Sequence, residues 1–435
     1  VTASAPGTLA TAGGTVTVQA GGAAQLAGIT TGGGSVTITA GSTAAFISPL
    51  TISGPFLVTA AGNSTFNAAI SGGGALTVNT AGVTRFNGAI SGLGSLLTNT
   101  GGSTVLAGGA LGVSGSFRFN DPVTLEAATT ISGPTGRFNS TLDGAQALNV
   151  ILSGDAVFVG AVGGTQRLAS ITTDNAGRTL FYGGSILTTG AQAYNDAVLL
   201  GTNTVFAASA LTFNNTVNTG PTLASLGGLS AAATGESDLT ANVSGATVFN
   251  APVGQTSRVG DVTTDVPGTT TIAANFNATK MTFRDPVIIA GGAPITIDAS
   301  TASTTEGISF HQGLTGAGRT IVLNAPLATI SSAGDIGSAT GRFAAVTAAG
   351  RNLVVGGDVW AEGDILLAIG TNGSDTSNDF LQFTVPGSVT PRTTRLDSAT
   401  GSIVLGSGAV PGTTAKTAAP LRASLFKSNP GDLLL

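Results

Sequence analysis

The chain contains no cysteine, and only one of its 435 residues is a histidine. Without cysteine, neither a disulfide bond nor a thiolate metal site can form. A Ser-His-Asp arrangement would have to use His311, which follows an apolar stretch and precedes Gly313. That position is typical of a solvent-facing or ladder histidine, so we expect the protein not to be an enzyme of this type.

Charge is also scarce: charged residues make up 9% of the chain, and the net charge is −5. The only lysines are Lys280, Lys416 and Lys427, and no basic patch occurs, so we expect no nucleic-acid partner. No apolar run approaches the roughly 20 residues that a spanning helix needs, so we expect no membrane-spanning segment. Residues 1–5 lack the charged start and apolar core of a cleavable signal.

Glycine, by contrast, is abundant, with 66 residues, and hydrophobic residues make up 42% of the chain. Two segments are near copies of each other: TFNAAISGGGALTVNT begins at Thr65, and RFNGAISGLGSLLTNT begins 20 residues later at Arg85. Phenylalanine, asparagine and isoleucine keep their places in both copies. A fixed step of this size is typical of stacked units that bury their apolar sides against their neighbours.

Polar and apolar residues alternate within each copy, which predicts short strands joined at glycine-rich corners. Two or three such strands would form one turn of a parallel β-helix (β-solenoid), with turns about 4.8 Å apart. Phe66 would then lie over Phe86 inside, and Asn67 over Asn87 would form an amide ladder. We expect residues 1–370 to form this solenoid.

A recurring phrase ending in a strand occurs as FNDPV at 119–123, as YNDAV at 194–198 and as FRDPV at 283–287. We expect its aspartates, Asp121, Asp196 and Asp285, to lie at corners that open a strand and to bond local backbone amides. Binding of a cation or a sugar by these carboxylates is the weaker alternative, because no second acid accompanies them.

A longer repeat of 91 residues relates the segment around Arg167 to the segment around Arg258. Phenylalanine, valine, threonine, aspartate and glycine also recur at this distance. We expect each arginine to pair with an acid on the turn above or below. An exposed pair of this kind contributes only about 0–1 kcal/mol, so stability has to come from the stacked core.

Residues 371–435 are predicted to form a polar loop, a proline-containing tail and a terminal turn that serves as a cap or as a contact arm. Oxygen-rich loops can hold calcium, which takes about 6–8 oxygen ligands. Asp375, Asn378 and Asp379 are therefore calcium candidates. Their spacing matches neither an EF-hand nor a calcium-binding roll, so a solvated loop without a cofactor is favoured.

The phrase LTTGAQAYNDAVLL at 187–200 and the preceding LASITTD at 168–174 look like strand repeats of giant bacterial surface proteins. They resemble filamentous-haemagglutinin-like exoproteins, and the copies at 65–98 resemble repeats of autotransporter passengers. The resemblance covers about residues 60–370. It implies a right-handed parallel β-helix that is exported across a Gram-negative envelope. Neither the amino-terminal secretion domain of the first group nor a carboxy-terminal membrane barrel is found.

These patterns together predict a non-enzymatic secreted surface protein, an adhesin-like rod or a building block of an extracellular fibre. Its partners would be other protomers or the surface of a host or neighbouring cell, and its location the outside of a Gram-negative-type bacterium. One alternative is a self-assembling filament or surface-layer subunit. Another is a carbohydrate-active β-helix enzyme, which would carry three or more acids in one groove.

Overall fold

The protein is all-β, and its strands pair in parallel with strands of the turns before and after them, which confirms the predicted β-solenoid. The chain divides into two compact units: unit 1, Val1–Ala208, and unit 2, Ser209–Leu435. The structure is a computed structural model that describes residues 9–11, 13–222, 236–302, 305–369, 381–382, 395–400, 402–407, 425–428 and 433–434. Among these residues, none forms a helix long and apolar enough to cross a membrane.

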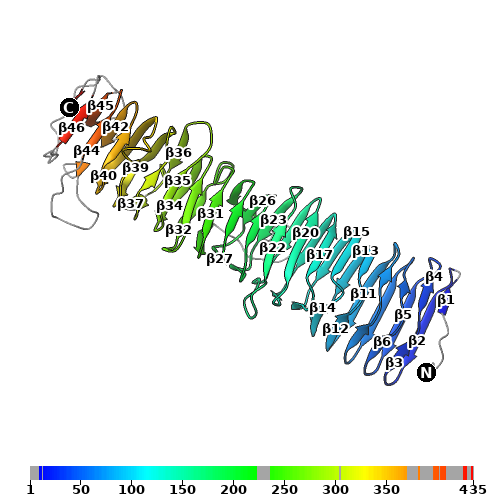
Figure 1. Cartoon of the computed structure of the whole chain (residues 1–435). Helices are drawn as coiled ribbons and strands as arrows, with labels where there is room; N and C mark the ends of the chain where they lie inside the picture. Colours follow the sequence, from blue (N-terminus) through cyan, green and yellow to red (C-terminus); the bar gives the residue numbers. More distant parts are fainter. Residues whose placement is uncertain are drawn as a thin grey trace. The chain divides into compact units, whose positions relative to one another are not determined.

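Unit 1 is built from turns of three short strands, and equivalent strands of successive turns lie side by side as three faces (Figure 1). The first face contains β1 (Leu9–Thr11), β4 (Ile29–Thr31), β7 (Leu50–Thr51), β10 (Ile70–Ser71), β13 (Ile90–Thr98), β15 (Ala110–Phe119), β17 (Thr129–Gly133), β20 (Ala147–Leu152), β22 (Ser170–Thr173) and β25 (Gln192–Tyr194). The long strands β13 and β15 run along the second face as well.

The other two faces of unit 1 follow the same order along the chain. The second face contains β2 (Val16–Ala20), β5 (Val36–Ala40), β8 (Phe56–Ala60), β11 (Ala75–Thr80), β18 (Thr135–Phe138), β21 (Asp155–Phe158), β23 (Arg178–Phe181) and β26 (Ala197–Leu200). The third face contains β3 (Ala24–Leu26), β6 (Ala44–Phe46), β9 (Ser64–Phe66), β12 (Val83–Phe86), β14 (Ser103–Leu106), β16 (Val123–Leu125), β19 (Leu142–Asp143), β24 (Ser185–Leu187) and β27 (Thr204–Ala208).

Part of the core of unit 1 is a column of stacked rings. Phe46, Phe66 and Phe86 are at most 1% exposed. The ring centroids of Phe46 and Phe66 are 4.6 Å apart and those of Phe66 and Phe86 are 4.9 Å apart, with interplanar angles of 7° and 14°. Phe66 therefore pairs directly with Phe86, as the 20-residue step predicts. Because each ring covers the next, apolar area is buried between turns as well as within them.

Glycine at the corners lets neighbouring turns approach closely. Gly102 has a φ of 74°, and a Cβ atom on it would lie 1.8 Å from the carbonyl oxygen of Gly82 in the preceding turn. Any other residue would meet both the unfavourable backbone conformation and the backbone of the neighbouring turn. The stacking of turns thus accounts for part of the high glycine content.

Unit 2 has the same parallel stacking but longer strands. One series contains β28 (Leu211–Phe213), β31 (Ala246–Phe249), β33 (Thr269–Ile272), β35 (Val287–Ile289), β38 (Leu314–Thr315), β41 (Val359–Ala361), β44 (Arg395–Ser398) and β46 (Leu425–Ser428). The other strands are β29 (Val217–Thr219), β30 (Leu239–Val243), β32 (Val259–Thr264), β34 (Phe276–Phe283), β36 (Ile295–Asp298), β37 (Glu306–Phe310), β39 (Thr320–Ser332), β40 (Ala345–Val355), β42 (Ile365–Ile369), β43 (Leu381–Gln382), β45 (Ile403–Ser407) and β47 (Leu433–Leu434).

Candidate functional site

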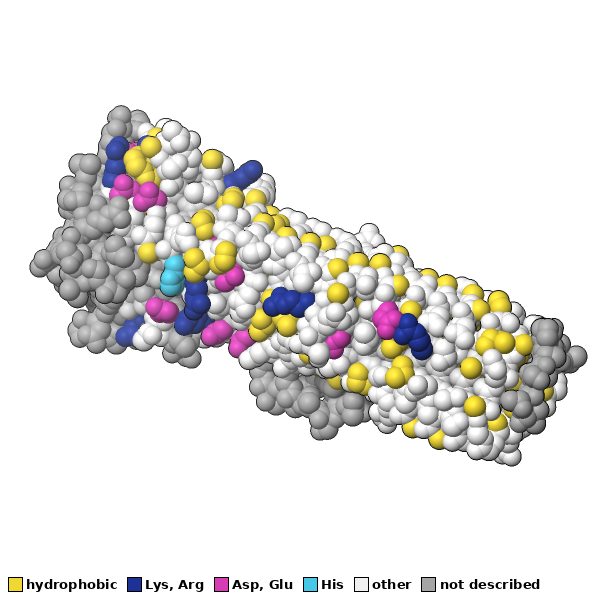
Figure 2. Space-filling model, turned by 60° about the horizontal axis from the view of Figure 1, so that its bottom comes forward, with side chains coloured by type: hydrophobic (Ala, Val, Ile, Leu, Met, Phe, Trp, Pro, Cys, Tyr) yellow, Lys and Arg dark blue, Asp and Glu magenta, His cyan; other side chains and the backbone are white. Residues whose placement is uncertain are grey.

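Charged side chains are few on the face drawn in Figure 2, where they lie in small separate groups on a surface of mostly uncharged atoms. Most of the charged side chains that contact other residues belong to polar networks between turns. In the described part of the chain, no group of three or more His, Cys, Asp or Glu side chains is arranged to hold a metal ion. The calcium candidates Asp375, Asn378 and Asp379 lie outside the described residues.

The first network surrounds Asp196, at the corner between β25 and β26. Its side chain is buried, and its carboxylate accepts hydrogen bonds from the hydroxyls of Thr173 at 2.6 Å and Thr179 at 2.7 Å, both on the preceding turn. Asn195 holds the corner in place, because its backbone N–H donates to Thr173 Oγ1 at 3.1 Å and its side-chain amide donates to Thr173 O at 2.7 Å. We call the two threonines and the aspartate a Thr–Asp–Thr bracket.

The bracket occurs at all three copies of the phrase seen in the sequence. The other two consist of Thr98, Thr104 and Asp121 in unit 1, and of Thr264, Thr270 and Asp285 in unit 2. The expectation that these aspartates lie at corners is correct. Each carboxylate also bonds its own backbone amide, as expected, but the sequence did not indicate that threonine hydroxyls of the preceding turn would bind both carboxylate oxygens.

Burial raises the pKa of all three bracket carboxyls above the ordinary value, and the hydrogen bonds from the threonines oppose this effect. The pKa of Asp196 is raised to about 6. These carboxyls therefore hold their charge at a cost in free energy at neutral pH. They are enclosed by the turns that they connect, which favours a structural role over contact with a ligand.

The raised pKa of Asp196 predicts that unit 1 is more stable in mild acid than at neutral pH. Below the unfolded-state pKa near 4 the contribution is fully present, and it is lost as the pH rises through about 6. Stability should fall by at most about 3 kcal/mol over this interval. In the Asp196→Asn variant this slope should be reduced, because the amide carries no charge and Thr179 can turn to accept its N–H. Urea unfolding between pH 4 and 7.5 measures the slope, and an unchanged slope in the variant contradicts the assignment.

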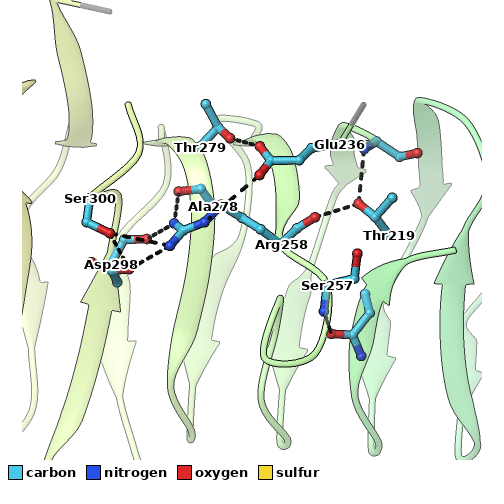
Figure 3. A network of polar contacts seen from close by, with 10 residues as sticks. Thr219, Glu236, Ser257, Arg258, Ala278, Thr279, Asp298 and Ser300 are labelled. Carbon is cyan, nitrogen blue, oxygen red and sulfur yellow. Dashed lines mark hydrogen bonds and ion pairs between the residues drawn. The ribbon is translucent and has the colours of Figure 1, made fainter. Parts of the chain in front are cut away.

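The second network is centred on Arg258 in unit 2 and is drawn in Figure 3. Its Nη1 donates to the backbone oxygen of Ala278 at 3.0 Å and to that of Asp298 at 3.1 Å, on the next two turns. Its Nη2 lies 2.8 Å from Asp298 Oδ2, and Glu236 lies on the other side, 4.0 Å from Nε. One guanidinium thus connects three turns.

Asp298 is itself surrounded by donors. Ser300 Oγ donates to its Oδ2 at 2.9 Å, and Asn324 Nδ2 donates to its Oδ1 at 2.7 Å. Burial raises the pKa of this carboxyl, but the bonds from Arg258, Ser300 and Asn324 outweigh burial, so the net pKa lies below the ordinary value. Asp298 is therefore ionised throughout the physiological range, and its charge is balanced within the network.

A third network in unit 2 repeats this design around Arg342. Its Nη1 donates to the backbone oxygens of Ala361 and Asp397, both at 3.0 Å, and lies 2.9 Å from Asp397 Oδ1. Arg395 also pairs with Asp397, and the guanidinium carbons of Arg342 and Arg395 lie 5.1 and 4.6 Å from the ring centroid of Trp360. The only tryptophan is thus in contact with two cations of its own chain.

From the 91-residue repeat, an acid partner was expected for both Arg167 and Arg258, and the structure shows one for Arg258 only. Arg258 pairs with acids. Arg167 Nη1 donates to the backbone oxygen of Thr188 at 3.1 Å, the equivalent of the bond to Ala278, but makes no ion pair among the described residues. The acid partner of Arg167 was therefore predicted wrongly, because the turn that supplies Asp298 in unit 2 has no acid counterpart here.

The predicted amide ladder belongs to a larger arrangement on the outer surface of unit 1. Asn87 Nδ2 donates to Asn67 Oδ1 at 3.0 Å, and Arg85 Nε donates to Asn87 Oδ1 at 2.7 Å. The two terminal nitrogens of Arg85 then bind the two carboxylate oxygens of Glu126, which is 41 residues further on.

His311, the only histidine of the chain, directly follows β37 in unit 2, and its side chain is exposed.

Comparison of the chain with protein-family models, with curated proteins and with solved structures gives no match.

Proposed function

We propose that this chain is a non-enzymatic structural protein of a bacterial surface, which acts as an adhesin-like support or as a building block of an extracellular fibre. Two considerations lead to this proposal: the β-solenoid itself, and the resemblance of the repeats at 65–98 and 187–200 to exported surface proteins. The Gram-negative outer surface as its location follows from the resemblance alone. Its partners would be further copies of the chain or the surface of another cell.

The observation that best supports a structural role is where the polar side chains direct their hydrogen bonds. The bracket carboxyls and the guanidiniums of Arg258 and Arg342 bind to neighbouring turns of the same chain. A catalytic group has to leave a donor or acceptor for its substrate, whereas these groups use theirs to hold turns together. Stiffness over many turns is the property that a support or a fibre subunit needs.

Two measurements test the proposal. Antibodies against the chain should label intact cells of the source organism as strongly as permeabilised cells, and labelling only after permeabilisation contradicts the surface location. The purified chain should release no new reducing ends from a panel of neutral and acidic polysaccharides. Release that a single substitution abolishes would identify an enzyme. Electron microscopy of the same sample distinguishes a fibre subunit, which forms regular polymers, from a support that stays monomeric.

A further inference from the structure

Unit 1 contains a second copy of the arrangement around Arg85. Arg137 Nε donates to Asn139 Oδ1, and Asn139 Nδ2 donates to Asn120 Oδ1 at 2.5 Å. Asn120 is fixed in turn, because its Nδ2 donates to Thr98 O at 2.6 Å. In both copies the bond from Nε sets the orientation of the guanidinium plane and leaves the two terminal nitrogens for another partner.

The two copies differ in that partner. In the first copy Glu126 stands two turns after Asn87 in the same row, since Phe86 pairs with Leu106 and Leu106 with Leu125. In the second copy the equivalent position is Tyr182, since Phe138 pairs with Phe158 and Phe158 with Phe181. A phenol therefore replaces the carboxylate. In the part of the chain that the structure describes, Arg137 forms no ion pair.

A second cation lies beside this one. Arg118 pairs in register with Arg137, one turn before it, so the two side chains leave the same face about 4.8 Å apart. Arg118 is exposed and forms no ion pair with any described residue. Burial lowers the pKa of Arg137, and the positive charge of Arg118 adds to this effect. The nearby carboxylate of Asp155 is already bound by Arg178, with contacts of 2.9 and 2.8 Å.

We propose that Arg118 and Arg137 bind carboxylates of an acidic polysaccharide, a polymer of uronic acid type. The Arg85–Glu126 pair shows which group this guanidinium geometry accepts, a carboxylate held by both of its oxygens. A polymer suits the site because two cations on successive turns can engage two charges of one chain, which multiplies the affinity of either alone. The half-buried ring of Tyr182 beside them offers an amphipathic surface for a sugar ring.

This inference names the ligand of the proposed surface function and so rests on it, but it can fail separately. The purified full chain is mixed with polygalacturonate, and binding is measured by calorimetry at low and at physiological salt. We expect binding that weakens with salt and that falls about tenfold or more in Arg118→Gln/Arg137→Gln, since a hydrogen bond to a charged group is lost at each position. Tyr182→Glu should have a similar effect, because it places a carboxylate where Glu126 lies in the first copy.

Arg85→Gln is the matched control, since it removes a positive charge whose partner is already in the chain, and it should bind as the unsubstituted protein does. The inference is overturned if the unsubstituted chain does not bind polygalacturonate, if the double variant binds as well as the control, or if Arg85→Gln loses as much affinity. Equal binding of polyglutamate or dextran sulfate would overturn the uronic acid assignment. Surface labelling that persists while polygalacturonate binding is absent leaves the proposed function intact and removes only this ligand.

Discussion

Replacing Phe66 with alanine is expected to destabilise the turns around it by about 3–5 kcal/mol, the usual cost of removing a buried phenylalanine side chain. Phe66 lies between two rings, with centroid distances of 4.6 Å to Phe46 and 4.9 Å to Phe86, so the cavity would open on both sides. The turns cannot collapse to fill it, because their spacing is set by backbone hydrogen bonds. Hydrogen exchange, measured by mass spectrometry, gives the loss of protection turn by turn.

The position of that loss is as informative as its size. In a stack of repeats each unit contacts only its neighbours, so protection should fall most in β6, β9 and β12 and remain in distant turns of unit 1. Phe66→Leu is the control, since it keeps most of the volume and gives up mainly the ring contacts, worth about 0.5–1.5 kcal/mol each. Equal loss of protection along the whole of unit 1 would contradict nearest-neighbour stacking.

The fold could be predicted because one regularity, the 20-residue step, determines the register of most strands in the early turns. Val16 pairs with Val36, and Phe66 pairs with Phe86, because equal steps place equal residues at equal positions. The outer amide ladder follows from the same step, since a side chain on one turn lies over its copy on the next. Stacking requires no information beyond the period and the alternation within each strand.

The polar networks could not be predicted in the same way, because their partners come from turns of unequal length. In the brackets the second threonine precedes the aspartate by 17 residues at Asp121 and Asp196 but by 15 at Asp285. A threonine in a strand also looks the same whether it faces solvent or a buried carboxylate. The available signal was the pair of threonines six residues apart before each copy of the phrase, at 98 and 104, 173 and 179, and 264 and 270.

The pairing of Arg118 with Arg137 on the outer surface could not be predicted from the sequence either. The sequence contains no run of basic residues, and Arg118 and Arg137 are 19 positions apart, so nothing local indicates a cationic pair. Only the register of β15 and β18 brings them together. A search for charged patches along the sequence therefore misses a patch that forms across turns.

Replacing Arg258 with methionine is expected to destabilise unit 2 by about 2–4 kcal/mol, because it removes a partly buried charge and leaves its partner unpaired. Two backbone oxygens, of Ala278 and Asp298, would lose a donor, and the carboxylate of Asp298 would keep only Ser300 and Asn324. The single tryptophan, Trp360, lies in unit 2, so its fluorescence during urea unfolding reports on this unit.

Two further variants test whether the loss of stability comes from the Arg258 network or from the removal of any positive charge. Lys280→Met removes a cation 3.7 Å from Glu306 in a more exposed pair, and we expect it to cost no more than about 1 kcal/mol. Arg258→Met/Asp298→Asn should recover part of the loss of Arg258→Met, because the carboxylate left without its partner is then neutral. If Arg258→Met and Lys280→Met cost the same, the guanidinium does not connect the turns energetically. The three-turn contact would then be a consequence of the stacking and not one of its causes.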